Sequence, residues 1–304
     1  MGKIAFVFAG QGAQYAGMGR DLYEYSSRVK KLFEMAESKR PGIAELCFGG
    51  PKEMLDITVN TQPAMFLADL ACAEALDENG VKAGGAAGFS LGEIPAACYA
   101  GLMGFDKAFD FVCRRAELMQ ECAEKNRGVM FAVLKLSAEQ VESICAGIEN
   151  AWPVNYNCPG QTVVACAESA AEELQSRIAE AGGKAVRLAV SGAFHSPFMD
   201  AASRGIAKHL EGESPGAPRV PLYANATAER YGDAKGLLAK QVNHPVLWQK
   251  TIENMARDGF DVFIEAGPGK TLAGLIKKID GNVKALNVND VKSLEITLEE
   301  LRNV

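Results

Sequence analysis

The chain has 304 residues, enough for one large domain or for a large domain together with a smaller one. Its apolar content of 48% and its charged content of 23% are ordinary for a globular protein in water. The formal net charge of −6 argues against a general nucleic-acid binder, which is usually basic, although a local basic patch for an acidic partner is compatible with it.

The first part of the chain is predicted to alternate strands with helices. The expected elements are strands at 3–9 and 84–89 and helices near 21–37, at 62–78, up to residue 101, and at 106–125. For the helix at 62–78 we expect Thr61 as the cap, Pro63 in the first turn and Asn79-Gly80 at the end. This alternation predicts an α/β layer with a mainly parallel sheet.

The middle of the chain has a different order of elements. The pattern predicts strands at 129–136, 154–156, 162–166 and 185–190, with a helix that Ser137 opens by a capping box and another at 170–181. The order β-α-β-β-α-β is that of the ferredoxin-like unit. We therefore predict a small domain at 128–190, inserted into a larger domain formed by 1–127 and 191–304. A strand at 262–265 and a helix at 271–279 belong to the larger domain.

The eight cysteines form no C-x-x-C pair, and most of them lie in apolar runs. We expect them to be reduced core residues, with neither disulfides nor a bound metal. The apolar run near the start is too short for a secretion signal, and no apolar run approaches the ~18 residues of a membrane span. These features predict a cytoplasmic protein that does not enter a membrane.

Two glycine-rich turns suggest phosphate binding but lack the residues that it requires. Gly10-Gln11-Gly12 follows a strand, yet a dinucleotide-binding fingerprint needs a third glycine where Tyr15 stands. The stretch 267–271 ends like a P-loop, yet that pattern needs glycine where Ile264 stands. We interpret both as tight strand-to-helix turns and do not expect nucleotide hydrolysis.

Residues 88–92 form a G-x-S-x-G pentapeptide between an expected strand and an expected helix. A nucleophile elbow needs small residues two positions before and after its serine, because the strand and the helix approach closely there. Amides at the start of the helix would then face an oxyanion that forms at Ser90. The same pattern arises by chance in glycine-rich chains, so the pentapeptide alone leaves a nucleophile and a simple loop serine both open.

A nucleophilic serine needs a base, and the chain has three histidines. His209 lies in a helix-like run, and His244 precedes a proline in a turn. His195 lies in a small-residue loop at 191–197, just after the predicted small domain. His195 is therefore the best candidate for the base, with a structural histidine as the alternative.

Arg115 falls near the middle of the apolar face of the helix at 106–125, between Val112 and Met119. A buried guanidinium is costly unless it is paired, and its planar fork suits a carboxylate. From the residues alone, a carboxylate of the protein or a side chain that reaches solvent explains Arg115 as well as a functional role does.

Several motifs coincide in order and spacing, and together they are specific where each alone is weak. They are F-A-G-Q-G-A-Q at 8–14, N-T-Q-P-A at 60–64, G-F-S-L-G-E at 88–93, R-A-E-L-M-Q at 115–120, S-G-A-F-H-S at 191–196, Q-V-N-H-P-V-L-W at 241–248 and E-A-G-P-G-K-T-L-A-G-L at 265–275. Over nearly its whole length the chain resembles the malonyl-CoA:acyl carrier protein transacylases and the related acyltransferase domains of polyketide synthases. This resemblance implies an α/β-hydrolase-like catalytic domain with an inserted ferredoxin-like domain.

The resemblance also implies a role for each matching residue of the site. Ser90 would accept the acyl group, with His195 as its base, and the main-chain carbonyl of Gln241 would orient the histidine ring. The amides of Gln11 and Leu91 would form the oxyanion hole.

Substrate selection would depend on residues elsewhere in the chain. Arg115 would pair with the free carboxylate of a malonyl group, and Met119, one turn further along the helix, would lie in the same pocket. Phe194, in the Ala-Phe-His form typical of malonyl-selective relatives, would crowd an α-methyl branch. A small pocket discriminates against a methyl group by only ~1–3 kcal/mol, so we expect a preference and not an exclusion.

The sequence departs from the family pattern at three places. Phe89 replaces the usual histidine before the serine, and we expect it to alter the neighbourhood of the pocket without abolishing catalysis. Pro95 is expected beyond the first turn of the following helix, where it removes one backbone donor and bends the helix. Ala9 and Ala13 replace proline and serine around Gly-Gln-Gly, with little expected effect.

The implied reaction is a ping-pong transfer of malonyl from malonyl-CoA to the phosphopantetheine thiol of acyl carrier protein, supplying fatty-acid synthesis. No cofactor is expected, since the partner carries the phosphopantetheine, and the family suggests a monomer. Carrier proteins are typically acidic, which makes Lys184, Arg187, Lys277 and Lys278 candidates for docking, although a solvated charged face explains these residues equally well.

Three alternatives stay open at this point. The acceptor could belong to polyketide synthesis. A serine esterase or thioesterase would share the elbow but would place a carboxylate beside His195 and would have no need of Arg115. A non-catalytic module that docks carrier protein is suggested only by Phe89.

Overall fold

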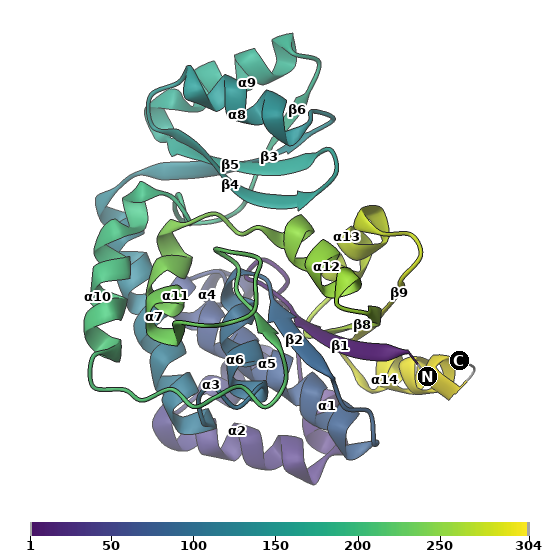
Figure 1. Cartoon of the computed structure of the whole chain (residues 1–304). Helices are drawn as coiled ribbons and strands as arrows, with labels where there is room; N and C mark the ends of the chain where they lie inside the picture. Colours follow the sequence, from purple (N-terminus) through teal and green to yellow (C-terminus); the bar gives the residue numbers. More distant parts are fainter. Residues whose placement is uncertain (1, 303–304) are drawn as a thin grey trace.

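The computed structural model describes residues 2–302 and contains two separate sheets with helices around them (Figure 1). Sheet A has five parallel strands in the order β7-β2-β1-β8-β9. Sheet B has four antiparallel strands in the order β4-β5-β3-β6 and forms the upper end of the molecule in Figure 1. The predicted fold class, an α/β layer with a parallel sheet plus a ferredoxin-like sheet, is confirmed.

The elements have the following bounds. Sheet A consists of β1 (Lys3–Phe8), β2 (Gly85–Gly88), β7 (Leu222–Tyr223), β8 (Phe260–Ala266) and β9 (Lys284–Val288). Sheet B consists of β3 (Gly128–Leu134), β4 (Ala151–Cys158), β5 (Gln161–Ala167) and β6 (Lys184–Arg187), with helices α8 (Ala138–Ala146) and α9 (Ala171–Glu180). The remaining helices are α1 (Arg20–Tyr25), α2 (Ser27–Lys39), α3 (Ile43–Gly49), α4 (Lys52–Leu55), α5 (Thr58–Glu78), α6 (Glu93–Tyr99), α7 (Phe105–Lys125), α10 (Asp200–Leu210), α11 (Ala234–Lys240), α12 (Trp248–Arg257), α13 (Thr271–Ile279) and α14 (Val291–Arg302).

Strand β1 lies at the centre of sheet A and is buried on both faces. Ile4, Phe6 and Phe8 point into the core that α5 and α7 share, whereas Ala5 and Val7 point into a second core with α12 and α13. Side chains alternate between the two faces of a strand, so a strand covered by helices on both sides needs a continuous apolar run. That requirement explains the sequence K-I-A-F-V-F.

Sheet B has the strand order and directions of the predicted β-α-β-β-α-β unit. Ser137 caps α8 in a capping box with Gln140, as predicted. The hairpin is tighter than expected, because β4 continues to Cys158 and β5 already begins at Gln161. β6 ends at Arg187, before the predicted end at 190. These elements run from 128 to 187, and the domain limits at 128 and 190 stay predictions.

Helix α5 begins at Thr58, four residues before the predicted start. Thr61 is not its cap, since the Thr61 hydroxyl donates to the carbonyl of Ile57 inside the first turn. Pro63 lies within the helix and has no N–H for the carbonyl of Val59. Nη1 of Arg40 donates to that carbonyl at 2.7 Å instead, so the helix passes the proline with the acceptor satisfied.

Other predicted elements differ in smaller ways. The helix expected near 21–37 is two helices, because Ser26 is extended and its hydroxyl caps α2. Pro95 lies in the first turn of α6, where a missing N–H is tolerated, and not beyond it. Strand β9 and helix α14 had no counterpart among the predicted elements. Within residues 2–302, no helix is both long and apolar enough to cross a bilayer.

Candidate active site

Ser90 is the first residue of the short 3₁₀ turn that joins β2 to α6. Its φ of 52° is in the left-handed region, which is strained for a residue other than glycine. A Cβ on Gly88 would lie 1.9 Å from the backbone of Gly92, and one on Gly92 would lie 2.1 Å from the carbonyl oxygen of Phe8. Glycine is therefore required on both sides of the serine, as a nucleophile elbow demands.

His195 is placed to accept the proton of Ser90. Its Nε2 lies 2.7 Å from Oγ of Ser90, and its Nδ1 lies 2.8 Å from the main-chain oxygen of Gln241. A carbonyl oxygen only accepts hydrogen bonds, so Nδ1 carries the hydrogen and Nε2 is left free to act as a base. The structure thus brings together the predicted serine, its base and the carbonyl that orients the ring. His209 and His244 lie elsewhere, on α10 and beside α11.

Burial of His195, which is only 3% exposed, lowers the pKa of its imidazole to about 4. The positive charge of Arg115 contributes to this lowered pKa, whereas the hydrogen bond to the carbonyl of Gln241 acts in the opposite direction. The ring is therefore neutral at neutral pH, which is the form that can take a proton from serine.

Arg115 lies on α7 with 1% of its surface exposed, so its side chain does not reach solvent. Nη1 donates to Oε1 of Gln62 at 2.6 Å, and Nη2 donates to Oε1 of Gln241 at 2.8 Å. Among residues 2–302 no carboxylate forms an ion pair with it, and its Nε has no hydrogen-bond partner. Burial lowers its pKa to about 10, so the guanidinium stays charged at neutral pH. A buried cation held only by neutral amides is suited to an anionic ligand.

The turn after β1 lies beside the serine because β1 and β2 are parallel neighbours in register, with Phe8 opposite Gly88. Gln11 follows in that turn, and its side chain reaches Oγ1 of Thr58 at 3.4 Å. In the described part of the chain, the main-chain amides of Gln11 and Leu91 donate to no other protein group. Both remain candidates for the oxyanion hole, with donors available to a ligand.

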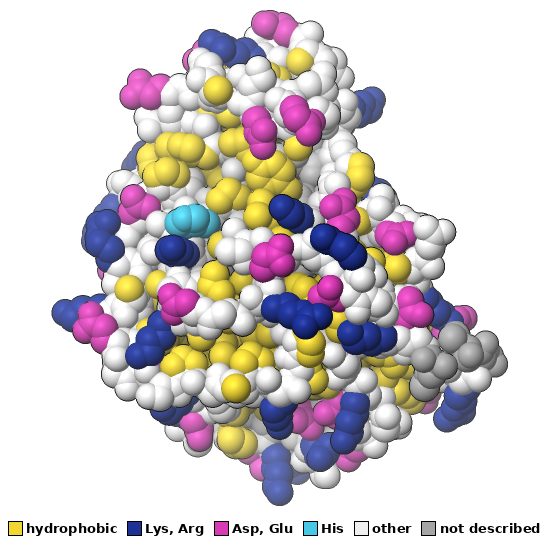
Figure 2. Space-filling model, viewed as in Figure 1, with side chains coloured by type: hydrophobic (Ala, Val, Ile, Leu, Met, Phe, Trp, Pro, Cys, Tyr) yellow, Lys and Arg dark blue, Asp and Glu magenta, His cyan; other side chains and the backbone are white. Residues whose placement is uncertain are grey.

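A cavity of about 260 Å³ opens at Ser90 between the two sheets. Gln11, Ser90 and His195 line it from the large-domain side, and Asn155 and Asn157 on β4 line it from sheet B. On the face shown in Figure 2, hydrophobic side chains gather where sheet B meets the larger part of the molecule, with Lys and Arg side chains below them. A cleft between two layers can hold an extended substrate and limit the access of water to it.

Three further residues border this cavity. Phe194, which is 6% exposed, and Met119 both line it, and their contact with a substrate stays a prediction. Phe89 lines it as well, and its ring packs edge-on against Trp248 with centroids 5.5 Å apart. The aromatic ring in place of the family histidine is thus accommodated by the second core of sheet A.

The turn at 267–271 is closed to a phosphate. Glu265, at the end of β8, points its carboxylate at the start of α13 and accepts from the amide of Ala273 at 2.8 Å. A carboxylate therefore already occupies the place where a P-loop would hold its anion. This agrees with the interpretation of the segment as a tight strand-to-helix turn.

The sequence analysis missed residues that support the site from behind. Oδ1 of Asn225 accepts from the amide of Ser90 at 2.7 Å, and its Nδ2 donates to the carbonyl of Gly88 at 2.6 Å. Gln62 and Glu93 both lie within motifs of the family resemblance, at 60–64 and 88–93, but neither was predicted to have a role in the site. Their only signal was a polar residue inside an apolar or glycine-rich stretch. Asn225 lies in Y-A-N-A-T, where its pattern resembles an ordinary turn.

The geometry defines a serine acyltransfer site, and comparisons with known proteins agree with it. The sequence model described as "Acyl transferase domain" matches residues 5–296. The chain therefore belongs to the acyl transferase family.

Relatives that cover almost the whole chain share one name. The malonyl CoA-acyl carrier protein transacylase of Bacillus subtilis is 35% identical, over 99% of this chain and 98% of that protein. The protein of the same name from Haemophilus influenzae is 37% identical, over 99% of this chain and 100% of its own length.

Solved structures give the same result. The malonyl CoA-acyl carrier protein transacylase from Clostridium perfringens superposes with a TM-score of 0.95 at 38% identity, covering 99% of this chain and 98% of its own. A malonyl-transacylase in complex with a type II polyketide synthase acyl-carrier protein superposes with a TM-score of 0.94 at 34% identity, covering 98% of this chain and 99% of its own.

Proposed function

We propose that this chain transfers a malonyl group from malonyl-CoA to the phosphopantetheine thiol of acyl carrier protein, through a malonyl ester on Ser90. The observation that carries the proposal is the pairing of the Ser90–His195 dyad with Arg115, a buried cation without a carboxylate partner in the described protein. The names of the full-length relatives support the same substrate pair.

The first half-reaction loads the serine. His195 takes the proton of Ser90 as Oγ attacks the thioester carbonyl, and the amides of Gln11 and Leu91 stabilise the oxyanion. When the intermediate collapses, the carbon–sulfur bond breaks and the imidazolium returns its proton to the departing coenzyme A sulfur. Arg115 holds the free carboxylate of the malonyl ester.

The second half-reaction reverses the roles. The phosphopantetheine thiol gives its proton to His195 as its sulfur attacks the ester, and the same two amides stabilise the oxyanion. Oγ of Ser90 leaves and regains the proton from the imidazolium. No cofactor takes part in either half, since the transferred group moves between thioester and ester without oxidation or reduction.

A hydrolase on the same elbow is a weaker interpretation of this site. The histidine partner is a main-chain carbonyl and not a carboxylate, and Arg115 would have no task in simple ester hydrolysis. A polyketide carrier as acceptor is favoured by one observation, the structural neighbour in complex with a type II polyketide synthase acyl-carrier protein. The two acceptors differ only in the partner, so a comparison of carrier proteins distinguishes them.

The four basic residues considered for docking do not form one patch. Lys184 and Arg187 lie on β6, at the opposite edge of sheet B from β4, and α13 with Lys277 and Lys278 packs against β4. Arg187 is also paired with Glu168 at 3.0 Å. The pair on α13 is therefore the better candidate for contact with an acidic carrier.

We further propose that the protein works in the cytoplasm as a monomer. All eight cysteines are free thiols, and six of them are buried in the core, which suits a reducing compartment.

The deciding experiment is incubation with malonyl-CoA, with and without a fatty-acid carrier protein bearing phosphopantetheine, followed by intact-mass measurement. We expect one malonyl adduct on the protein alone and its transfer when the carrier is added. Ser90→Ala should give no adduct. Rapid release of free malonate without transfer to any carrier, fatty-acid or polyketide, would contradict the proposal.

A further inference from the structure

Glu93 is a fully buried carboxyl group three residues after the nucleophile, at the start of α6. One of its oxygens accepts from the hydroxyl of Tyr231, and the other accepts from the main-chain amide of Asn225 at 3.2 Å. Burial raises the pKa of Glu93 to about 7, although both hydrogen bonds oppose that rise. The acyl transfer derived above gives this carboxyl no task.

Two residues, Asn225 and Gln241, connect Glu93 to the reacting groups. The main-chain amide of Asn225 donates to Glu93. The side chain of Asn225 holds the elbow, because it accepts from the amide of Ser90 and donates to the carbonyl of Gly88. The side-chain amide of Gln241 lies beside Glu93 and donates to the main-chain oxygen of Ser90, while its oxygen accepts from Nη2 of Arg115. A single residue, Asn225, therefore links Glu93 to the elbow of Ser90. A single side chain, that of Gln241, links Glu93 to the guanidinium of Arg115.

The charges of Glu93 and Arg115 stabilise each other across this network. The guanidinium lowers the pKa of Glu93, and the carboxylate raises the pKa of Arg115. Neither group forms a direct ion pair with any residue in the range 2–302. The groups that act on the charge of Glu93 are Arg115 from α7, Tyr231 after β7, Asn225 and the amide of Gln241.

We propose, building on the proposed function, that Glu93 is the internal counter-ion of Arg115 and a positioning residue for the Ser90 elbow, and that the carboxylate of a bound malonyl group replaces it as the partner of Arg115. Glu93 touches no reacting atom in this arrangement. It acts through Asn225 on the serine and through its charge on the arginine.

The replacement has a consequence for protons. When the malonyl carboxylate approaches Arg115, a second negative charge disfavours ionised Glu93, and its pKa rises in the loaded enzyme. The loaded form then binds more protons than the free form, so the gain in malonyl loading is full below about pH 7 and is lost as pH rises above 7 toward the higher pKa of the loaded form. An acetyl group has no carboxylate, so acetyl loading lacks this dependence.

The test compares the equilibrium occupancy of Ser90 by malonyl and by acetyl, from malonyl-CoA and acetyl-CoA, by intact mass between pH 6 and 8. The ratio of the two constants cancels the ionisation of coenzyme A and of His195, which both reactions share. We expect the malonyl-to-acetyl ratio to fall about tenfold over this range in the wild type, as one linked proton allows. In Glu93→Gln, which keeps the shape and the acceptor oxygen, the ratio should be flat.

Two further variants separate charge from structure. Tyr231→Phe keeps the carboxyl of Glu93 but removes the hydroxyl that lowers the pKa of Glu93. The fall in the malonyl-to-acetyl ratio should therefore move to higher pH. Glu265→Gln removes another buried carboxyl whose pKa is about 7 and which lines the same cavity but does not act on Arg115; if Glu93 carries the dependence, the ratio should then fall as in the wild type.

The outcomes are distinct. A flat wild-type ratio, or a fall that Glu93→Gln retains, would overturn this inference and leave the proposed function standing. If Glu93→Gln does not fold, the Tyr231→Phe variant decides. A malonyl-to-acetyl ratio that falls at the same pH in Tyr231→Phe as in the wild type would also overturn the proposed role of Glu93. Absence of any malonyl ester at every pH would overturn the proposed function, and this inference with it.

Discussion

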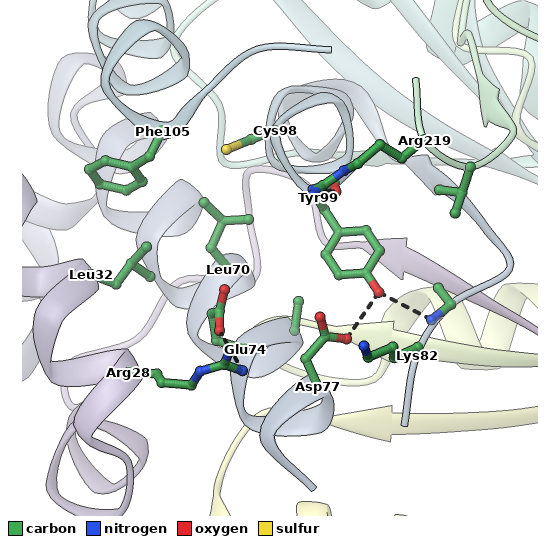
Figure 3. A pocket seen from close by; sticks show the side chains of 13 residues that line it. Arg28, Leu32, Leu70, Glu74, Asp77, Lys82, Cys98, Tyr99, Phe105 and Arg219 are labelled. Carbon is green, nitrogen blue, oxygen red and sulfur yellow. Dashed lines mark hydrogen bonds and ion pairs between the residues drawn. The ribbon is translucent and has the colours of Figure 1, made fainter. Parts of the chain in front are cut away.

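Two cavities differ in a way that shows what marks a reactive site in this molecule. The larger, of about 430 Å³, lies beside Tyr99 at the far end of α6 from the nucleophile (Figure 3). Several of its charged side chains are partnered within the protein: Arg28 lies 3.6 Å from Glu74, Arg219 donates to the carbonyl of Tyr99 at 2.9 Å, and the hydroxyl of Tyr99 donates to Asp77 at 3.0 Å. Little in that cavity requires a ligand.

The smaller cavity at Ser90 is lined by a strained serine, by a buried neutral histidine and by Gln62, whose side chain accepts from a guanidinium that lacks a carboxylate partner among residues 2–302. Each of these features costs free energy in the free protein, and each is relieved or used when an anionic acyl group binds. Backbone strain and unpaired charge therefore locate the site better than volume does. The following variants test that contrast, beginning with the largest expected effect.

Removal of the nucleophile from the smaller cavity should cause the largest loss of malonyl transfer. Ser90→Ala should lower malonyl transfer by about 10⁴-fold or more, because no other group can form the acyl ester. Steady-state transfer to carrier protein measures the loss, and circular dichroism checks the fold. Residual covalent malonylation of this variant would show that the nucleophile lies elsewhere.

Loss of the buried cation should change selectivity as well as rate. Arg115→Ala should reduce malonyl transfer by about 100-fold or more, since a buried charge-assisted pair contributes ~2–5 kcal/mol. Relative use of acetyl-CoA should rise, as measured by competition between the two thioesters. Arg115→Lys is the matched control, and it should recover only part of the loss because it keeps the charge without the planar fork. An unchanged malonyl preference in Arg115→Ala would remove the assigned role.

Protonation of His195 should make the rate of malonyl-serine formation fall at acid pH. The pKa of His195 is lowered to about 4, and only the neutral ring can accept the serine proton. The rate of malonyl-serine formation should therefore be insensitive to His195 above pH 5 and fall about tenfold per unit below pH 4. Rapid-quench measurements at saturating malonyl-CoA, with a fold check at each pH, test this. A limb centred near pH 6.5 would mean that the histidine is not desolvated.

A smaller effect is expected at the wall of the pocket. Phe194→Ala should increase the use of methylmalonyl-CoA relative to malonyl-CoA by about tenfold, because it removes the ring that would crowd an α-methyl group. Competition between the two thioesters under identical conditions measures the ratio. If the ratio does not move, the methyl group meets another side chain.

The smallest effect belongs to the larger cavity. Tyr99→Phe removes the hydroxyl that donates to Asp77 and accepts from the amide of Ala83, while the ring keeps its packing against Phe6. Its free energy of unfolding should fall by about 1 kcal/mol, measured by urea denaturation. Malonyl transfer should stay at the wild-type level. A large loss of transfer would show that this cavity matters to the reaction.

Much of the site could be predicted from local sequence. The glycines around Ser90 are dictated by close approach at one turn, and the apolar surroundings of Arg115 follow from helical periodicity. The start of α5 was predicted wrongly because Pro63 was expected in the first turn, whereas a distant arginine satisfies the carbonyl that the proline leaves free. Such a contact, between residues 19 positions apart, leaves no local pattern.

By itself the sequence determined the alternation of strands and helices, the turn that carries Ser90 and the identity of the chemical groups, because these depend on neighbouring residues. Only the tertiary structure decided which groups meet. Parallel pairing of β1 with β2 brings the Gln11 turn beside Ser90, and the return of the chain after sheet B brings His195 to 2.7 Å from the serine. It also left Arg115 with amide partners and placed Glu93 and Asn225 behind the elbow, since burial and long-range hydrogen bonds are properties of the folded chain.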